Sequence, residues 1–232
     1  RKQKIRRSNV RARLIIFGTL AVLLILFSIF SEYLTPYDPY LQDLSIAKSP
    51  PSSEHFLGTD RYGRDMLSRV MVGSRTSIFS TLLLVAVITT LGTAVGVFCG
   101  WRGGWLDTVL MRISDMFLAF PGLVFALAVA GTLGGGLQNA IIALAAISWP
   151  KYARIARSQT LAQKETVWMK AAKLSGSSTA KLIFKHILPN ILGPILVTSM
   201  LDIGTMMMEL AALSFLGLGA KPPTAEWGSM MS

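Results

Sequence analysis

The chain has 232 residues, of which 52% are hydrophobic and only 15% are charged, and its mean hydropathy is +0.52. This composition excludes an ordinary soluble domain and predicts that lipid is the main solvent. The net charge of +11 would fit a nucleic-acid binder only if the basic residues were interleaved with exposed aromatics. They flank apolar segments instead, as expected for retention on the cytosolic side of a membrane. The lone Cys99 excludes an intramolecular disulfide and provides no metal-binding spacing.

The first element is an apolar run over residues 14–30, preceded by a basic segment over residues 1–13. With the residues that follow it, the run approaches the roughly 20 residues that cross a bilayer as a helix. A secretory signal shares this pattern, but no small-residue cleavage site follows. We therefore interpret the run as a retained first transmembrane helix with a cytosolic N-terminus.

Residues 31–76 are polar and turn-rich and are expected to form an external loop, much of it irregular. In its second half, Asp60, Arg61, Arg64, Asp65 and Arg69 lie at spacings of three and four residues that allow local ion pairs. This segment is either a solvated interfacial helix or a part with a direct functional role.

Residues 77–232 are expected to form the core domain of an all-α transmembrane bundle. Its spans are predicted over residues 77–100, 108–130, from 139 onward, and 188–210. Together with the first helix they give five spans and an external C-terminus. Small residues at Gly92, Gly96 and Gly100 predict close contact with another helix. In the third span, Arg112 and Asp115 are one turn apart, which permits a neutralising pair.

The fifth span carries polar residues on one face. Thr198, Asp202, Thr205 and Glu209 are spaced four, three and four apart, with Met206 beside them. Two carboxyl groups on one stripe are expected to face a partner helix or a water-filled path rather than lipid. The stripe is therefore either part of a translocation path or an interhelical hydrogen-bonding seam. Whether any metal binds the chain is unknown from the sequence.

A basic insert over residues 151–187 separates the last two spans and is predicted to be cytosolic. It is expected to form a helix, a break at Ser175–Ser178 and a second helix capped by Ser178 or Thr179. A plain solvated loop is the alternative. The chain has no phosphate-binding GxxxxGK[ST] motif, and His55 and His186 are predicted on opposite sides of the membrane. We therefore expect no catalytic activity and no bound cofactor in this chain.

Part of the insert resembles the coupling (EAA) loop of permease subunits of bacterial ABC importers. The matching residues are Ala171, Ala172, Gly176, Ile187 and Pro189. The resemblance implies that a short coupling helix docks into a groove on an ATP-binding subunit. Lys170 replaces the acidic residue usual in the family, and Glu165 is nearby but out of register.

Four further stretches resemble the second permease of the dipeptide, oligopeptide and nickel importers. They are His55–Arg69; Gly103–Asp107 with Arg112 and Asp115; Leu118–Pro121; and Leu213–Gly219 with Trp227–Gly228. The resemblance implies a type I permease in the bacterial inner membrane. Its partners would be a second permease, two ATP-binding subunits that use ATP and Mg²⁺, an external substrate-binding protein and membrane lipid. Family members have six spans, so a final helix is expected to be missing here.

The substrate expected from the resemblance is nickel or a nickel chelate, with a dipeptide or oligopeptide as the alternative. Leu201–Gly204, Met206–Met207 and Thr224–Gly228 look closer to nickel-type permeases. Transport would proceed by alternating access driven by closure of the ATP-binding subunits. A passive channel is a more distant alternative, and an integral-membrane enzyme would need a catalytic cluster that the sequence lacks.

Overall fold

The computed structural model describes the backbone of residues 2–232 and the side chains from Arg11 onward. Over this part the chain is all-α, and its one strand-like feature is an isolated bridge between Thr59 and Asp65. The basic residues expected to hold the N-terminus in the cytosol lie mostly outside the described side chains. The helices are α1 (Lys2–Leu34), α2 (Met66–Arg102), α3 (Gly104–Ala119), α4 (Gly122–Thr132), α5 (Leu137–Lys164), α6 (Val167–Leu174), α7 (Thr179–Lys181) and α8 (Leu188–Phe215), with a π-helical turn at Leu182–Ile187 and 3₁₀ turns at Leu44–Ile46 and Ser229–Met231.

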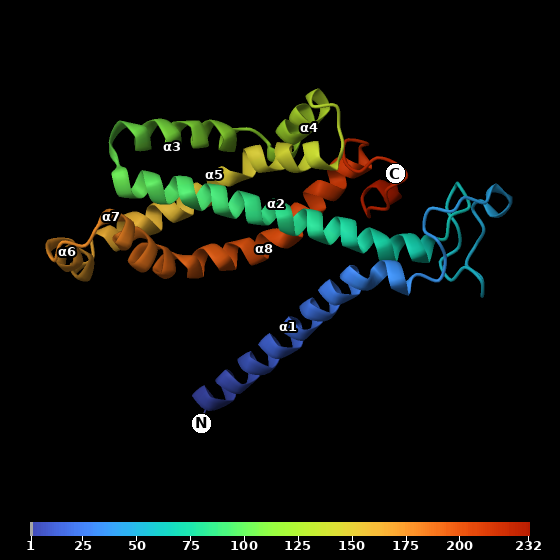
Figure 1. The fold of residues 1–232 in the computed structure, drawn as a ribbon, viewed down its shortest axis with the longest axis horizontal. Coiled ribbons are helices and arrows are strands. Elements are labelled where there is room, and N and C mark those ends of the chain that lie inside the picture. The colour runs from blue at the N-terminus through green and yellow to red at the C-terminus, as the bar shows by residue number, and fades with distance from the viewer. Residues whose placement is uncertain (1) are drawn as a thin grey trace. The chain divides into compact units, whose positions relative to one another are not determined.

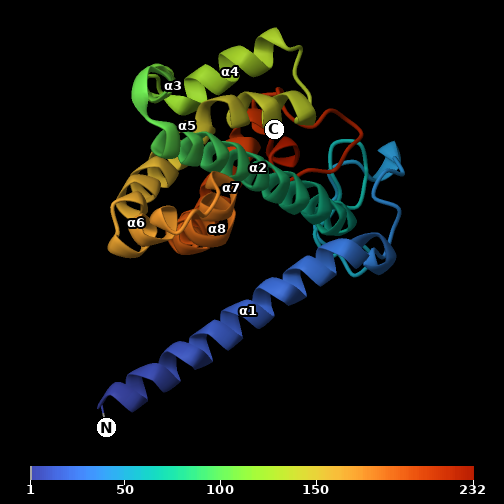
Figure 2. The ribbon, with the colours of Figure 1, turned by 60° about the vertical axis from the view of Figure 1, so that its left-hand side comes forward.

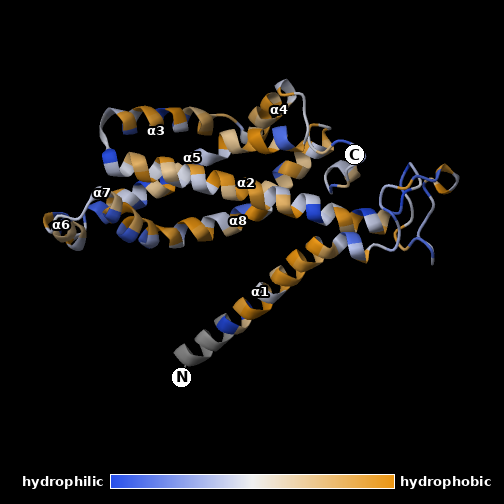
Figure 3. Cartoon of the chain, in the orientation of Figure 1, coloured by the Kyte–Doolittle hydropathy of each residue, from blue (hydrophilic) through white to orange (hydrophobic). Residues whose placement is uncertain are grey.

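The chain divides into two compact units. The first comprises the residues up to Phe79 together with Pro222–Met230, and the second comprises Ser80–Lys221 with the last two residues. In the first unit, the apolar part of α1, Arg11–Leu34, is long enough to cross a membrane. Figure 3 shows it as a nearly continuous apolar band. Only 11% of its apolar window is buried in the chain, so lipid or another subunit must cover it.

Helix α2 begins at Met66, eleven residues before the predicted start of the second span. The reason is that Asp65, which was expected to form an ion pair, caps this helix. Asp65 accepts hydrogen bonds from the backbone amide of Ser68 at 2.8 Å and from its hydroxyl at 2.7 Å. An acidic side chain in this position satisfies an amide that has no partner within the helix, and it thereby fixes where the helix starts.

The predicted third span, residues 108–130, is two helices rather than one. Helices α3 and α4 meet at Phe120–Pro121 with a bend of 95°. Pro121 has no amide hydrogen to donate, and it drives the preceding residue out of the helical region. Phe120 accordingly adopts φ −88° and ψ 145°. By length and composition, three helices of the described chain could cross a membrane, or four if this bent pair counts as one span. The predicted five spans are therefore not confirmed.

Helix α5 occupies the centre of the second unit. It packs against α3, α4 and α8, as Figures 1 and 2 show from two directions. The shared core is formed by buried apolar side chains of these helices and of the second half of α2, including Leu84, Ile88, Leu144, Tyr152, Ile191 and Leu210. Tyr152, the largest fully buried side chain among the described residues, brings a polar hydroxyl group into this otherwise apolar core.

The glycines of α2 allow α5 to approach closely, as their spacing predicted. A Cβ atom added at Gly92 would lie 2.5 Å from the carbonyl oxygen of Trp149. One added at Gly96 would lie 2.2 Å from the carbonyl oxygen of Ala153, and one at Gly100 would lie 2.8 Å from Cβ of Thr160. All three distances are shorter than a van der Waals contact, so the two backbones touch along two turns.

We expect Gly96→Leu to separate α2 from α5 and to destabilise the protein by about 3 kcal/mol or more. This is at or above the upper end of the 1–3 kcal/mol typical of an overpacked core, because the obstructing atom belongs to the backbone. The measurement is thermal unfolding of the detergent-purified protein, with size-exclusion chromatography as the readout of the folded fraction. Gly131→Leu is the matched control, since a Cβ at Gly131 meets nothing within 4 Å. Equal melting temperatures for the two variants would contradict the proposed close contact.

Candidate functional site

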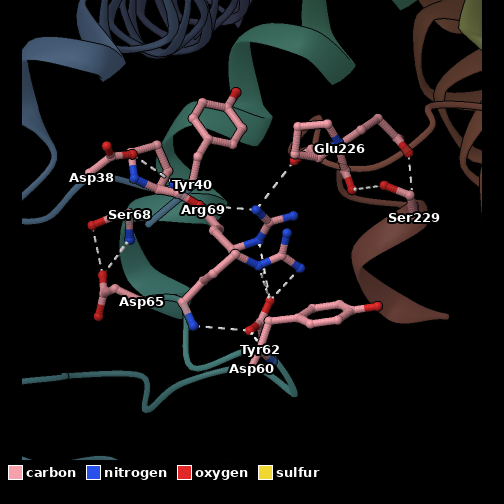
Figure 4. Close-up of polar contacts among 12 residues, drawn as sticks. Asp38, Tyr40, Asp60, Tyr62, Asp65, Ser68, Arg69, Glu226 and Ser229 are labelled. Carbon is pink, nitrogen blue, oxygen red and sulfur yellow. Dashed lines mark hydrogen bonds and ion pairs between the residues drawn. The ribbon is translucent and has the colours of Figure 1, made fainter. Parts of the chain in front are cut away.

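The loop between α1 and α2, residues 35–65, is held by a buried network of charged side chains (Figure 4). The Asp60 carboxylate pairs with Arg64, with Oδ2 2.6 Å from Nη2 and 2.7 Å from Nε. The same oxygen lies 3.6 Å from Nε of Arg69. Oδ1 of Asp60 accepts hydrogen bonds from the amides of Tyr62 and Arg64. The side chains of Arg64 and Arg69 are 8% and 5% exposed, so Asp60 is the counterion of two nearly buried guanidinium groups.

Of the two expectations for this segment, the solvated interfacial helix is wrong. Residues 58–65 form turns rather than a helix, and most of the predicted charges point inward. The ion pair of Asp60 with Arg64 is present at the expected spacing of four. Asp65, however, pairs with Nδ1 of His55 at 2.9 Å, a partner ten residues earlier. Arg61 is exposed and lies over the ring of Tyr62.

The same network ties the segment Pro222–Met230 to the start of α2. Arg69 donates to the carbonyl oxygens of Pro39 at 3.0 Å and Pro223 at 3.5 Å. Glu226, which is 1% exposed, accepts hydrogen bonds from Ser77 and from the amides of Gly228 and Ser229. The indole of Trp227 donates to the carbonyl oxygen of Val70 at 3.0 Å. Glu226 and Trp227 entered the sequence-based expectations only through the resemblance, as part of Thr224–Gly228, and their contacts with the start of α2 were not predicted.

The pKa values of Asp60 and Asp65 are lower than usual for a carboxyl group. Burial opposes ionisation of Asp60, but hydrogen bonds from the side chain and amide of Arg64, the amide of Tyr62 and the charge of Arg64 outweigh it. Burial likewise acts against ionisation of Asp65, and the hydrogen bonds from Ser68 and His55 outweigh it. Both carboxylates are therefore more stable as anions in the folded loop than in an unfolded chain.

A second candidate site is a cavity of 230 Å³ between α3, α4, α5 and α8. Three of the four residues of the predicted polar stripe line it, and so does the adjacent Met206. The lining residues are Leu118, Gly122, Ile147, Ser148, Lys151, Asp202, Thr205, Met206 and Glu209. Thr198 is not among them. Its hydroxyl donates to the carbonyl oxygen of Pro194 at 2.9 Å, one turn earlier in α8.

Asp202 has two partners on α5. Its Oδ1 lies 2.6 Å from Nζ of Lys151, and its Oδ2 accepts a hydrogen bond of 2.8 Å from the hydroxyl of Tyr152. The side chain of Asp202 is 7% exposed and that of Lys151 is 50% exposed, so the pair lies at the cavity wall with the lysine toward the open side. Glu209 has no hydrogen bond or ion pair with any described residue. Sequence reasoning missed Tyr152 and placed Lys151 in the basic insert, because the partners are 50 and 51 residues apart.

Helix α5 is also joined to α3 by ion pairs. Nε and Nη2 of Arg157 lie 2.5 and 2.6 Å from the two carboxylate oxygens of Asp107. Asp115 pairs with Arg154. The predicted pairing of Asp115 with Arg112 is therefore wrong. On α3 these two residues are only three apart, but the guanidinium of Arg154 on the facing helix satisfies Asp115 instead.

The third candidate site is the insert between α5 and α8. Helix α5 ends at Lys164, and the two residues Glu165 and Thr166 connect it to α6. Gly176 follows α6 with φ +78°, a conformation in which a side chain is strained. Ser178 caps α7 by accepting a hydrogen bond from the amide of Lys181 at 3.4 Å.

Lys170 and Glu165 form an exposed ion pair in this insert, with Nζ of Lys170 2.9 Å from Oε2 of Glu165. Glu165 has a lowered pKa because Lys170 donates to it.

The residues predicted for coupling divide between the surface and the core. Ala171, Gly176 and Pro189 are exposed, Ala172 is partly buried against the core, and Ile187 is fully buried. Ile187 therefore packs rather than presenting a side chain to a partner. Helix α6 is anchored by Met169, which is 2% exposed, and by the ring contact of Trp168 with His186.

Helix α6 presents an apolar stripe that the sequence analysis did not identify. Val167 and Leu174 are 84% and 89% exposed, and Ala171 lies between them at spacings of four and three. Met169 and Ala172 point to the opposite face. Unlike the apolar surface of α1, this stripe belongs to the basic insert that the sequence predicts to be cytosolic, and the described residues of the chain leave it exposed.

Comparison with known proteins finds relatives over most of the chain. The family model described as the inner membrane component of binding-protein-dependent transport systems matches residues 92–232, more than half of the chain. A probable D,D-dipeptide transport system permease of Escherichia coli K12 is 44% identical over 93% of this chain and 72% of its own length. A glutathione transport system permease of Pectobacterium atrosepticum is 39% identical with the same coverage. A nickel transport system permease of E. coli K12 is 39% identical over 97% of this chain and 80% of its own.

We expect Asp60→Asn to destabilise the 35–65 loop by about 3 kcal/mol, because it leaves two nearly buried guanidinium groups without their counterion. Limited proteolysis of the detergent-purified protein reports the loss as faster cleavage within the loop. Glu54→Gln is the control, since Glu54 is exposed in the same loop. Equal cleavage rates in the two variants would show that Asp60 does not hold the loop together.

The depressed pKa values also predict how the loop responds to acid. A carboxyl group whose folded pKa is lowered contributes stability above its ordinary pKa, 3.8 for aspartate, and that stability disappears as the pH falls through the folded pKa. The loop should therefore remain resistant to pepsin at pH 5 and become sensitive below about pH 4. Pepsin activity at each pH is normalised with an unfolded substrate. Cleavage that begins already at pH 5 to 6 would rule out these two carboxylates as the cause.

Proposed function

The chain belongs to the inner membrane components of binding-protein-dependent transport systems, and from that premise we propose that it forms one half of an ATP-driven path for short peptides. As a member of this family it is a multi-pass permease of ABC importers in the bacterial cytoplasmic membrane and is not itself catalytic. The observation that carries the proposal concerns helix α5. The middle of this helix lines the polar cavity, and its C-terminal end leads directly into the exposed helix α6.

The cavity is the candidate for the translocation path. It contains hydroxyl groups and charges of both signs between apolar walls, an arrangement that lipid-facing helices avoid because unpaired charges are costly there. Asp202, Thr205, Met206 and Glu209 are its contribution from α8. Its volume of 230 Å³ is below the roughly 300–1,000 Å³ of complete small-molecule sites. A second permease would supply the remaining wall.

Helix α6 is the candidate coupling element. Its apolar stripe of Val167, Ala171 and Leu174 has the spacing of a helix that lies in a groove. The partners are two ATP-binding subunits, which hold ATP and Mg²⁺, and closure of these subunits displaces α6. Because only Glu165 and Thr166 separate α6 from α5, a displacement of α6 is transmitted to the residues of α5 at the cavity. An external binding protein delivers the substrate.

A short peptide is favoured over nickel as the substrate. The nickel expectation rested on local sequence likeness, but relatives of 39–44% identity carry dipeptide, glutathione and nickel in their names. In the described part of the chain no group of three or more His, Cys, Asp or Glu side chains could hold a metal ion. The hydroxyl groups of Ser148 and Thr205 and the carboxyl group of Glu209 can form hydrogen bonds with the backbone and the ammonium group of a peptide.

We expect Leu174→Asp to abolish co-purification of the ATP-binding subunits and to reduce coupled ATP hydrolysis at least tenfold, because a charge would have to be buried in the docking groove. The measurement is affinity purification of the complex, followed by ATPase assay in proteoliposomes. Leu41→Asp is the matched control, because Leu41 is also exposed, at 68%, but lies in the 35–65 loop. A fully assembled and active Leu174→Asp complex would exclude docking through this stripe.

The same proteoliposomes distinguish the importer from a passive channel. An importer takes up labelled dialanine only with ATP, the binding protein and the ATP-binding subunits present. Uptake without ATP would support a channel, and ATP-dependent uptake of Ni²⁺ but not of dialanine would replace the proposed substrate class.

A further inference from the structure

The two carboxylates of the cavity differ in their surroundings. Asp202 is 7% exposed and has both oxygens occupied, one by the ammonium group of Lys151 and the other by the hydroxyl of Tyr152. Tyr152 is fully buried, so it cannot release Asp202 by a simple side-chain rotation into the cavity. A ligand that used Asp202 would have to break a 2.6 Å ion pair and a 2.8 Å hydrogen bond. Asp202 therefore joins α8 to α5 and is not free to bind a ligand.

Glu209 lies two turns further along α8, on the same face and in the same cavity. Among the described residues it has neither an ion pair nor a hydrogen bond. A partly buried carboxyl group in a cavity of a membrane bundle, without such a partner, is a candidate site for a ligand. The remaining positive group of the cavity, Lys151, is already engaged with Asp202. The unmet requirement of this cavity is thus a hydrogen-bond donor with positive charge.

We propose that Glu209 binds the amino-terminal ammonium group of the transported peptide, while Asp202 is a positioning residue that fixes α8 against α5. The inference rests on the proposed function of the cavity as part of the peptide path. An ammonium group donates three hydrogen bonds, and the Glu209 carboxylate can accept at least one of them. Thr205 and Ser148 also line the cavity and bear hydroxyl oxygens that can accept the others.

The size and composition of the cavity fit one end of a peptide. Its 230 Å³ holds an amino terminus and the first side chain, and Leu118, Ile147 and Met206 provide apolar walls for that side chain. Apolar walls lower the local dielectric and so strengthen charge-assisted hydrogen bonds. A bare divalent cation fits less well, because it would need several further carboxylate or imidazole ligands near Glu209.

The test is a binding cycle on the purified complex of both permeases and the ATP-binding subunits, without the binding protein. Equilibrium dialysis measures the affinity for labelled dialanine and for N-acetyl-dialanine, which lacks the ammonium group. In the wild type, acetylation should weaken binding about tenfold or more, the value of a charge-assisted hydrogen bond. In Glu209→Gln dialanine should bind as weakly as the acetylated peptide does, and acetylation should have no further effect.

Two further variants separate binding from folding. Glu209→Asp keeps the charge and should retain part of the preference for the free amine. Asp202→Asn should lower the melting temperature of the complex, and the molecules that remain folded should keep that preference. If the Glu209→Gln variant still prefers the free amine over the acetylated peptide, Glu209 does not bind the ammonium group. Loss of that preference in folded Asp202→Asn, with its retention in Glu209→Gln, would assign the binding to Asp202 instead.

Uptake by the wild-type transporter distinguishes the failure of this inference from the failure of the proposed function. ATP-dependent uptake of dialanine, combined with an unchanged preference in Glu209→Gln, refutes only the role of Glu209. If the wild type neither binds dialanine nor takes it up, the peptide path is wrong and the role of Glu209 is wrong with it.

Discussion

The pairing of charges along α5 is the interaction on which the second unit depends. Lys151, Arg154 and Arg157 are three and three residues apart, and each meets an aspartate of a neighbouring helix: Asp202 of α8, Asp115 of α3 and Asp107 of α3. Asp202 and Asp107 are buried, so each needs the cation that α5 supplies, because an unpaired buried charge costs several kcal/mol. Close packing against Gly92 and Gly96 then fixes the other side of α5.

The same helix lines the cavity and leads into the insert, so two of the three candidate sites share α5. The pair of Lys151 with Asp202 holds the cavity wall, and the C-terminal end of α5 leads within two residues to α6. Under the proposed function, a displacement of α6 reaches the cavity along this continuous helix without any side-chain relay. The 35–65 loop repeats the principle on a smaller scale, because Asp60 neutralises two nearly buried arginines and so sets the position of the first turns of α2.

Patterns within one segment could be predicted from the sequence. The all-α bundle, the apolar first helix, the glycine contact of α2, the cap at Ser178 and the Asp60–Arg64 pair all depend on neighbours along the chain or on composition. The errors arose where a distant partner competes with a near one. Asp115 pairs with Arg154 rather than with Arg112, Asp65 caps α2 and binds His55, and Pro121 turns one expected span into two helices. A spacing of three or four residues permits a contact, but it does not say which of two available partners lies closer.

The sequence by itself determined that this chain is a membrane permease with a basic insert between two apolar segments, because apolar runs, positive flanks and motif spacing are properties of local order along the chain. The polar stripe of α8 was also visible, since its residues recur with the helical period. Only the tertiary structure decided that Asp202 pairs with Lys151 and Tyr152 while Glu209 has no such partner among the described residues. It also decided that Val167 and Leu174 are exposed while Ile187 is buried. The physical reason is that the partners of these side chains come from other helices, and a linear pattern contains no distances between helices.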